Sequence, residues 1–232
     1  MKKLDIVYFV KPDLMNEELR FSLRSVEANF PHRSVWFYGG QPSEMIPDGR
    51  APLIQHGRSR YEKVKNMLIA ACESEELTED FWLFNDDFFI LKPQEEMPAW
   101  YDGTLYERIV HIEQKRHGTP SDYTHQLRRT VEVLEEAGKG CLNYAVHVPM
   151  KVNRKKMLET LGHFPAVPMF RALYGNDNEI GGIDAPDVKI HTSGDLIPEG
   201  AAFVSTSDSS FINGEVGKQI RALFTEKSRW EV

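Results

Sequence analysis

A short apolar run followed at once by acidic residues constrains this chain more than any other stretch. Phe81 to Phe84 are four consecutive apolar residues, and Asn85, Asp86 and Asp87 come directly after them. Such an uninterrupted run is typical of a strand buried on both faces, as in the middle of a parallel sheet. Open α/β sheets bind their ligands outside the carboxyl ends of these strands. The run therefore predicts an α/β fold with a ligand site at residues 85–87.

The two adjacent carboxylates favour a metal ion. Burying Asp86 and Asp87 without a positive partner would cost free energy. Mg²⁺ and Mn²⁺ suit such a site, because hard ions bind one or two carboxylates and complete their shell with phosphate oxygens and water. Neighbouring side chains on a strand point in opposite directions, so we expect one aspartate to bind the metal and the other to hold water or ligand hydroxyls. A surface turn is the alternative interpretation.

The N-terminal part of the chain shows the order strand, helix, strand. Ile6 to Val10 and Val35 to Tyr38 predict two buried strands. Between them, Asn16 is expected to cap a helix with one apolar stripe. The stripe consists of Leu19, Leu23, Val26 and Phe30. A further helix over residues 60–76 leads into the strand at Phe81. This order predicts right-handed crossovers and a mostly parallel sheet flanked by helices.

The second half of the chain has weaker patterns. Residues 92–121 and 163–200 lack clear periodicity, so we expect irregular structure there, with the first stretch lying over the site and contacting an acceptor. The other expected elements are a helix from about residue 121 to Gly138, a strand over Tyr144–Pro149, a helix capped by Asn153, a strand over Phe203–Thr206, and a last helix carrying Ile212, Val216, Ile220 and Leu223.

Composition excludes several classes of protein. A formal net charge of −7 argues against a non-specific nucleic-acid binder. Two cysteines without a CxxC spacing exclude a disulfide scaffold and a cysteine-based zinc site, and they suit a reducing compartment. The N-terminal apolar run contains Asp5 and lacks a cleavage site, and no apolar segment reaches 18 residues. We therefore expect a cytoplasmic protein without a membrane span.

Several blocks of the sequence resemble the Stealth family of sugar-1-phosphate transferases of capsular polysaccharide synthesis. The blocks that match its second conserved region are residues 16–27, Gly40-Gln41-Pro42, Asn66 and Phe84-Asn85-Asp86-Asp87. Shorter similarities are Val146-His147-Val148-Pro149, Phe170-Arg171 and Ser205-Thr206-Ser207-Asp208. The first conserved region of the family differs, because this chain has Val7-Tyr8-Phe9-Val10-Lys11-Pro12 there. More broadly, the acidic pair after a central strand resembles nucleotide-sugar glycosyltransferases of the GT-A type.

The resemblance implies a GT-A-like (Rossmann-like) catalytic domain over residues 1–232, with residues 1–93 as its nucleotide-binding half and an irregular acceptor-side half over 94–232. It implies that Asp87, His147 and Asp208 are catalytic, and that Asp86, Asp87 and His147 bind the metal. His147 could instead be a general base. The implied donor-binding residues are Val7, Tyr8, Lys11, Arg24, Asn66, Asn85, Asp86 and Arg171. The implied acceptor-side residues are Asp177 and Glu179.

These features predict a metal-dependent glycosyltransferase that moves a sugar from a nucleotide-sugar donor, a UDP-sugar above all, to a hydroxyl of a glycan or another acceptor. Three alternatives remain: a Stealth-type sugar-1-phosphate transferase, a glycosyltransferase acting on modified bases of phage DNA, and a non-catalytic nucleotide- or glycan-binding module. The candidate residues also have structural interpretations, namely a buried histidine for His147, a surface salt bridge for Arg171, a cap for Asp208 and a turn for residues 176–179.

Overall fold

A mostly parallel sheet forms the centre of the molecule in the computed structural model, which describes residues 3–12, 15–52 and 59–232. Its strands are β1 (Asp5–Val10), β2 (Val35–Gly39), β3 (Gly49–Ala51), β4 (Asp80–Phe84) and β7 (Met150–Asn153). They are arranged in the order β3-β2-β1-β4-β7. The first four are parallel, and β7 runs antiparallel to β4. The predicted α/β class, a mostly parallel sheet flanked by helices, is confirmed.

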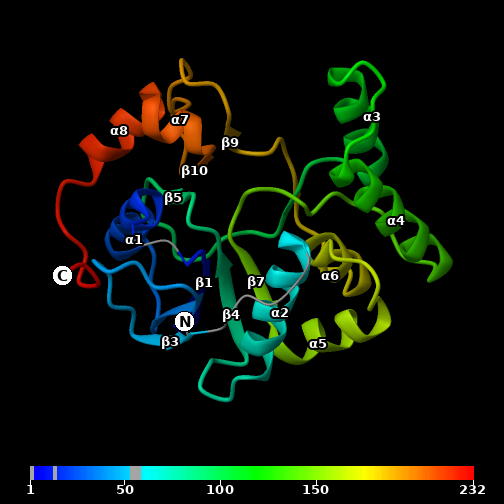
Figure 1. Ribbon diagram of the computed structural model, residues 1–232, viewed down its shortest axis with the longest axis horizontal. Coiled ribbons are helices and arrows are strands. Elements are labelled where there is room, and N and C mark those ends of the chain that lie inside the picture. The colour runs from blue at the N-terminus through cyan, green and yellow to red at the C-terminus, as the bar shows by residue number, and fades with distance from the viewer. Residues whose placement is uncertain (1–2, 13–14, 53–58) are drawn as a thin grey trace.

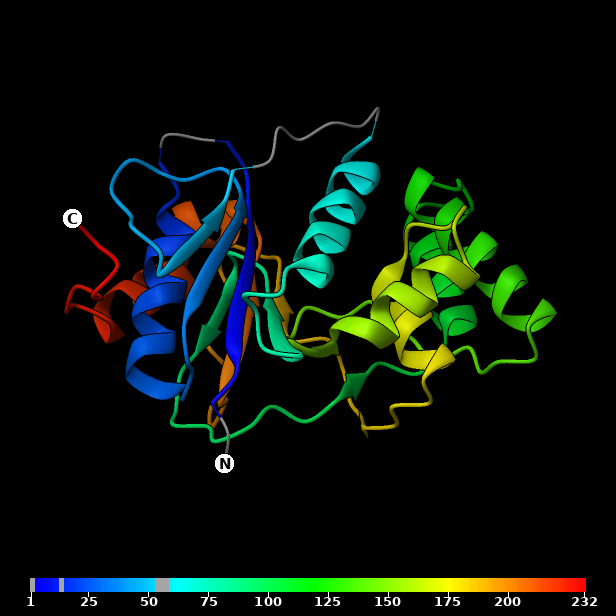
Figure 2. The same ribbon diagram turned by 90° about the horizontal axis from the view of Figure 1, so that it is seen from below.

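Helices cover both faces of this sheet. Helix α1 (Glu17–Asn29) lies on one face, and α2 (Arg60–Glu73) and α5 (Arg154–His163) lie on the other (Figure 2). Successive side chains of β1 alternate between the two cores, so that Tyr8 packs on the α1 side and Val7 on the α2 side. Strands buried on both faces need apolar residues at every position. This requirement explains the uninterrupted runs in the sequence.

A second sheet begins with the strand that follows the carboxyl end of β4 in the chain. It contains β5 (Phe88–Ile90), β10 (Phe203–Thr206) and β9 (Lys189–Ile190), in the order β5-β10-β9. Two helices follow β10, namely α7 (Asp208–Asn213) and α8 (Glu215–Leu223). The single last helix that we predicted is wrong, because Gly214 has an extended backbone and separates the two. Ile212 and Leu223, which we placed on its apolar face, are 60% and 57% exposed.

The two stretches that we expected to be irregular contain regular structure. Residues 92–121 include the short strand β6 (Trp100–Tyr101) and helix α3 (Leu105–Lys115), which begins with a capping box between Thr104 and Glu107. Residues 163–200 include α6 (Phe170–Asp177), β8 (Ile183–Asp184) and β9. Together with α4 (Asp122–Glu136), α3 and α6 enclose a core of their own. The α3–α4 hairpin lies at the opposite end of the molecule from α1 and α8 in both views (Figures 1 and 2).

The strand predicted over Tyr144–Pro149 is also wrong, since β7 begins only at Met150. The backbone before β7 bonds to side chains instead of to a neighbouring strand. The N–H of His147 donates to Asp187, and the carbonyl of Val148 accepts from Arg171. Backbone polar groups that are satisfied in this way do not need a sheet partner. No helix in the described part of the chain is long and apolar enough to cross a membrane.

Candidate active site

The acidic turn after β4 faces the N-terminus of α1. Asn16 is the N-cap of that helix, and its side chain accepts a hydrogen bond from the N–H of Leu19. The same side chain donates to Asp86 Oδ2 over 2.8 Å. Burial raises the pKa of Asp86, and the charge of Asp87 adds to this, whereas the bond from Asn16 and the charge of Lys11 oppose it. Asp86 and the exposed Lys11 therefore lie at the same edge of the sheet.

Asp87 points towards a different element. Its side chain forms an ion pair with Lys189 on β9, with 2.8 Å between Oδ2 and Nζ. The residue is only 8% exposed, and its other oxygen, Oδ1, is buried and has no hydrogen-bond partner among the residues that the structure describes. A buried carboxylate oxygen with free lone pairs costs free energy. This oxygen therefore marks a position where a ligand could bind.

Glu18 lies in the first turn of α1, close enough to Asp86 and Asp87 for their charges to act on it. Its Oε1 accepts a 2.8 Å hydrogen bond from Thr206 at the end of β10. Burial above all, together with the charges of Asp86, Asp87 and Asp208, raises the pKa of Glu18 to about 7, although the bond from Thr206 opposes the increase. Asp208 is exposed at the start of α7, next to this group. Glu18 was not among the site residues that we predicted from the sequence.

His147 and Asp187 form a pair beside this cluster. Asp187 accepts from the backbone N–H of His147 over 2.9 Å through one oxygen, and its other oxygen lies 2.7 Å from the ring Nδ1. Burial alone would raise the pKa of Asp187, but the bonds and charge of His147 and the charge of Arg108 outweigh it, so that this pKa falls below its usual value. Asp187 is therefore ionised at neutral pH. An ionised partner places the ring proton on Nδ1 and leaves Nε2 as a proton acceptor.

Arg171 interacts electrostatically with both Asp87 and Asp187. Its Nη1 donates to the carbonyl of Val148 over 2.7 Å, whereas Nη2 is buried and no described residue accepts a hydrogen bond from it. The side chain also lies over the ring of Phe88, at 5.6 Å from its centroid. Burial lowers the pKa of Arg171 to about 10, although the charges of Asp87 and Asp187 oppose the decrease. A guanidinium that remains charged at neutral pH, with a free buried donor, suits an anionic ligand.

A cavity of about 410 Å³ lies between α2, α3, α4 and α6 and residues 145–147, and Glu18, Asp86 and Asp87 do not line it. Asn85, His147 and Arg171 are the predicted site residues that line it. The remaining lining residues are Arg60, Tyr61, Val64, Arg108, Tyr123, Ala145, Val146, Pro168, Met169 and Phe170. A larger cavity of about 730 Å³ runs along β7 and residues 96–100 and shares only Val146 and Arg171 with it. The smaller cavity is the candidate active site, because His147 and the residue after β4 both reach it.

The predicted three-residue metal site is not formed. Within residues 3–12, 15–52 and 59–232, no group of three or more His, Cys, Asp or Glu side chains is arranged to hold a metal ion. His147 is bound to Asp187 instead of joining Asp86 and Asp87. The two aspartates still fit Mg²⁺ or Mn²⁺, since such ions accept one or two carboxylates together with phosphate oxygens and water. The unpartnered Oδ1 of Asp87 is consistent with that chemistry.

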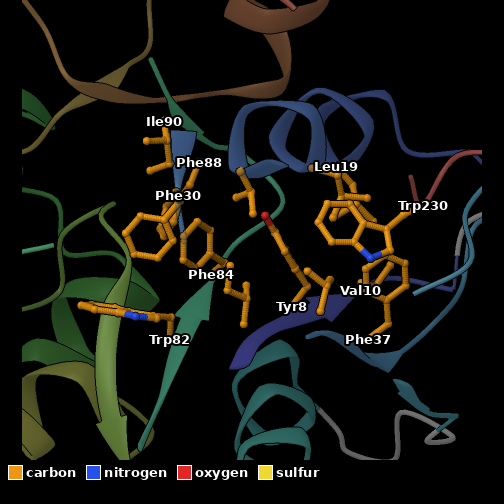
Figure 3. Close-up of a cluster of buried hydrophobic side chains, with 14 of the residues drawn as sticks. Tyr8, Val10, Leu19, Phe30, Phe37, Trp82, Phe84, Phe88, Ile90 and Trp230 are labelled. Atoms are coloured by element: carbon orange, nitrogen blue, oxygen red, sulfur yellow. The ribbon is translucent and has the colours of Figure 1, made fainter. Parts of the chain in front are cut away.

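Three of the predicted donor-binding residues have structural roles. Val7 and Tyr8 are fully buried in the sheet cores, so that their side chains offer no surface to a donor. Figure 3 shows Tyr8 among the core residues, and its hydroxyl lies 2.9 Å from Ser22 Oγ on α1. Arg24 forms two hydrogen bonds with Glu231, of 2.7 and 2.6 Å, and another to the carbonyl of Phe224. These contacts hold the C-terminal segment against α1.

The predicted acceptor-side acids and Asn66 do not line the cavity. Asp177 bonds to Thr160 and His163 and forms an ion pair with Lys139. Glu179 is exposed in a left-handed conformation after α6, with φ of 50°. Asn66 lies on α2 and borders a neighbouring hollow between α2 and α4. We therefore leave these residues out of the proposed site.

The sequence analysis missed Asp187, Lys189 and Arg108. The first two lie in a stretch without periodicity, where only the folded chain brings them to His147 and Asp87. Arg108 had a usable signal, because Thr104 and Glu107 form the capping box that starts its helix. That pattern would have placed a helix over residues 105–115.

Comparisons with known proteins find only remote likenesses. No protein-family model matches the chain, and no curated protein sequence does. A crystal structure of the glycosyltransferase GlyE from Streptococcus pneumoniae TIGR4 is 7% identical, with a TM-score of 0.33, over 56% of this chain. The apo form of the same enzyme is 8% identical, with a TM-score of 0.31, over the same share. The chain covers 43% of each of these structures.

Proposed function

We propose that this protein is a metal-dependent glycosyltransferase that uses a nucleotide-sugar donor. The observation that carries the proposal is the state of Asp87 and Arg171. Each has a buried polar atom, Oδ1 and Nη2 respectively, without a partner in the described part of the chain, and the charge of Asp87 acts on the pKa of Arg171. A carboxylate with one unpaired oxygen and a guanidinium with one unpaired nitrogen suit a metal-bound diphosphate, because the carboxylate can bind the metal and the guanidinium can donate hydrogen bonds to the phosphate oxygens.

The residues around the cavity have distinct roles in this proposal. Nε2 of His147 accepts the proton of the acceptor hydroxyl while the acceptor oxygen bonds to the anomeric carbon of the donor sugar. The bond between that carbon and the phosphate oxygen breaks, and its electron pair leaves with the nucleotide. Arg171 donates hydrogen bonds to the diphosphate as its charge develops. Asp187 keeps the ring of His147 oriented and balances the charge that the ring gains.

The metal would supply electrostatic stabilisation of the leaving nucleotide. Asp86 and Asp87 would hold it at the carboxyl end of β4. Asn16 fixes the orientation of Asp86, and Lys189 fixes that of Asp87. The exposed Lys11 lies close enough to Asp86 to lower its pKa and could contact the same phosphates.

Slow hydrolysis of the donor tests the proposal without knowledge of the acceptor. The protein is incubated with UDP-, GDP- and CDP-sugars and manganese, and the released nucleotide is measured by anion-exchange chromatography. We expect release from one class of donor, and a nucleoside diphosphate as the product. A nucleoside monophosphate would instead indicate transfer of a sugar-1-phosphate. Binding of a donor without any release would favour a non-catalytic module and contradict the proposal.

A further inference from the structure

The cavity at His147 is cationic although the chain as a whole is acidic. Three arginines line it, Arg60, Arg108 and Arg171, together with His147. None of its lining residues in the described part of the chain is acidic. The formal net charge of the chain is −7, so that composition alone does not explain this concentration of positive charge. A cavity of one charge sign attracts ligands of the opposite sign.

Arg108 is the residue whose state points to a ligand. It lies on α3, and its Nε is buried without a hydrogen-bond partner among residues 3–12, 15–52 and 59–232. The guanidinium is hydrogen-bonded to Tyr123 on α4: burial raises the pKa of that tyrosine, and the charge and the hydrogen bond of Arg108 oppose the increase. A buried N–H of a charged group that lacks an acceptor is costly. Arg171 Nη2 is in the same state and Arg171 lines the same cavity, so that one nitrogen of each of these two guanidinium groups lacks an acceptor among the described residues.

The position of Arg108 assigns this anion site to the acceptor. Arg108 comes from the α3–α4 hairpin (Figure 1), whereas the acids proposed to hold the donor metal follow β4. Its charge acts on Asp187, the partner of His147. An anionic group held by Arg108 therefore lies near the base that takes the proton of the acceptor hydroxyl. The planar fork of arginine fits phosphate oxygens in pairs, and several guanidinium groups together suit a dianion.

We propose that the acceptor carries a phosphate ester, which Arg108 binds together with Tyr123 and Arg60 while the acceptor hydroxyl lies at His147. This inference rests on the proposed function, because it names the substrate class of the same site. Arg171 remains the contact to the donor diphosphate. The phosphate ester is then recognised at a distance from the reacting bond and selects the acceptor.

Matched acceptors test the inference. Glucose and glucose 6-phosphate, and mannose and mannose 6-phosphate, are compared by the ratio of kcat/KM within each pair. We expect the phosphorylated member of a pair to be preferred by about tenfold or more, because charge-assisted hydrogen bonds are made to it alone. Arg108→Gln should reduce this ratio about tenfold. Arg128→Gln on the same hairpin is the control, since Arg128 is paired on the surface with Glu113 and does not line the cavity.

Binding of inorganic phosphate gives a readout that does not require turnover. Calorimetric titration of the protein saturated with UDP and manganese should show phosphate binding that Arg108→Gln weakens about tenfold and Arg128→Gln does not. Displacement of phosphate by UDP would assign the cavity to the donor and overturn the inference. Donor hydrolysis without any preference for phosphorylated acceptors would also overturn it, while leaving the proposed function intact. Absence of donor hydrolysis with every nucleotide-sugar would contradict the proposed function itself.

Discussion

Asp187 holds His147 at two points, through the backbone N–H and through the ring Nδ1, which lies 2.7 Å from its carboxylate. The two contacts leave the imidazole one orientation and one tautomer, with Nε2 free. A histidine held in this way is pre-organised to take a proton. The two residues are 40 positions apart in the chain, so that their pairing is a property of the fold.

Replacement of either residue should reduce turnover. His147→Gln removes the proton acceptor, and we expect kcat for sugar transfer to fall by about a hundredfold or more. Asp187→Asn should reduce kcat with little change in the KM for the donor, because it disturbs the tautomer of the base and not the donor contacts. Steady-state kinetics measures both values. His163→Gln is the matched control, since exposed His163 pairs with Asp177 outside the cavity. An Asp187→Asn protein with unchanged kcat would exclude the proposed pair.

The two aspartates after β4 should make donor hydrolysis dependent on metal. EDTA is expected to abolish nucleotide release and manganese to restore it. Asp86→Asn should reduce release by about a hundredfold, because one ligand of the charge-stabilising ion is lost. Asp87→Asn should have a similar effect. It should also destabilise the fold, since the mostly buried Lys189 loses the negative charge of its ion-pair partner. Release that persists in EDTA would contradict the metal assignment.

Glu18 should make stability fall as the pH rises. Its pKa is raised from 4.5 to about 7 in the folded protein, so that the folded state holds a proton that the unfolded state has already lost between these values. The protonation of Glu18 therefore leaves stability highest below about pH 4.5. The loss of stability caused by ionised Glu18 is complete above about pH 7. Glu18→Gln should raise the free energy of unfolding at pH 8 by about 1–2 kcal/mol and leave it nearly unchanged at pH 4.5. Urea unfolding at both pH values measures this, and an equal change at both would refute the explanation.

Arg24 should matter for stability and not for the donor. Arg24→Met leaves the carboxylate of Glu231, whose side chain is 4% exposed, without its main partner. The expected loss is on the order of 2 kcal/mol in the free energy of unfolding. Arg128→Met, which breaks the surface pair with Glu113, should cost less than about 1 kcal/mol. A large increase in the KM for the donor in a stable Arg24→Met protein would return Arg24 to the donor site.

The sequence predicted three of the five strands of the central sheet, because these three are mostly buried, and it did not predict β3 or β7. The runs Ile6–Val10, Val35–Tyr38 and Phe81–Phe84 match β1, β2 and β4 to within one residue at either end. Asn16 and Asn153 cap their helices as expected, through side-chain oxygens that accept from backbone N–H groups. These features are local, and apolar continuity and cap chemistry can be read from a few neighbouring residues.

The sequence predicted the positions of candidate site residues only where these residues directly follow a strand. Asn85, Asp86 and Asp87 follow β4, and their position follows from the position of the strand. The partners of His147 and Asp87 come from residues 187–189, which lie at the site where β9 pairs with β10. Periodicity carries no information on such long-range contacts. For the same reason Tyr8, which is a core residue, could not be told from a donor contact next to Lys11.

A crystal structure of the protein with UDP and manganese tests the central claim most directly. The account predicts manganese within about 2.5 Å of a carboxylate oxygen of Asp86 or Asp87, and a diphosphate that accepts hydrogen bonds from Arg171 Nη2. Nucleotide bound away from the carboxyl end of β4, with both aspartates and Arg171 keeping the contacts described above, would contradict it.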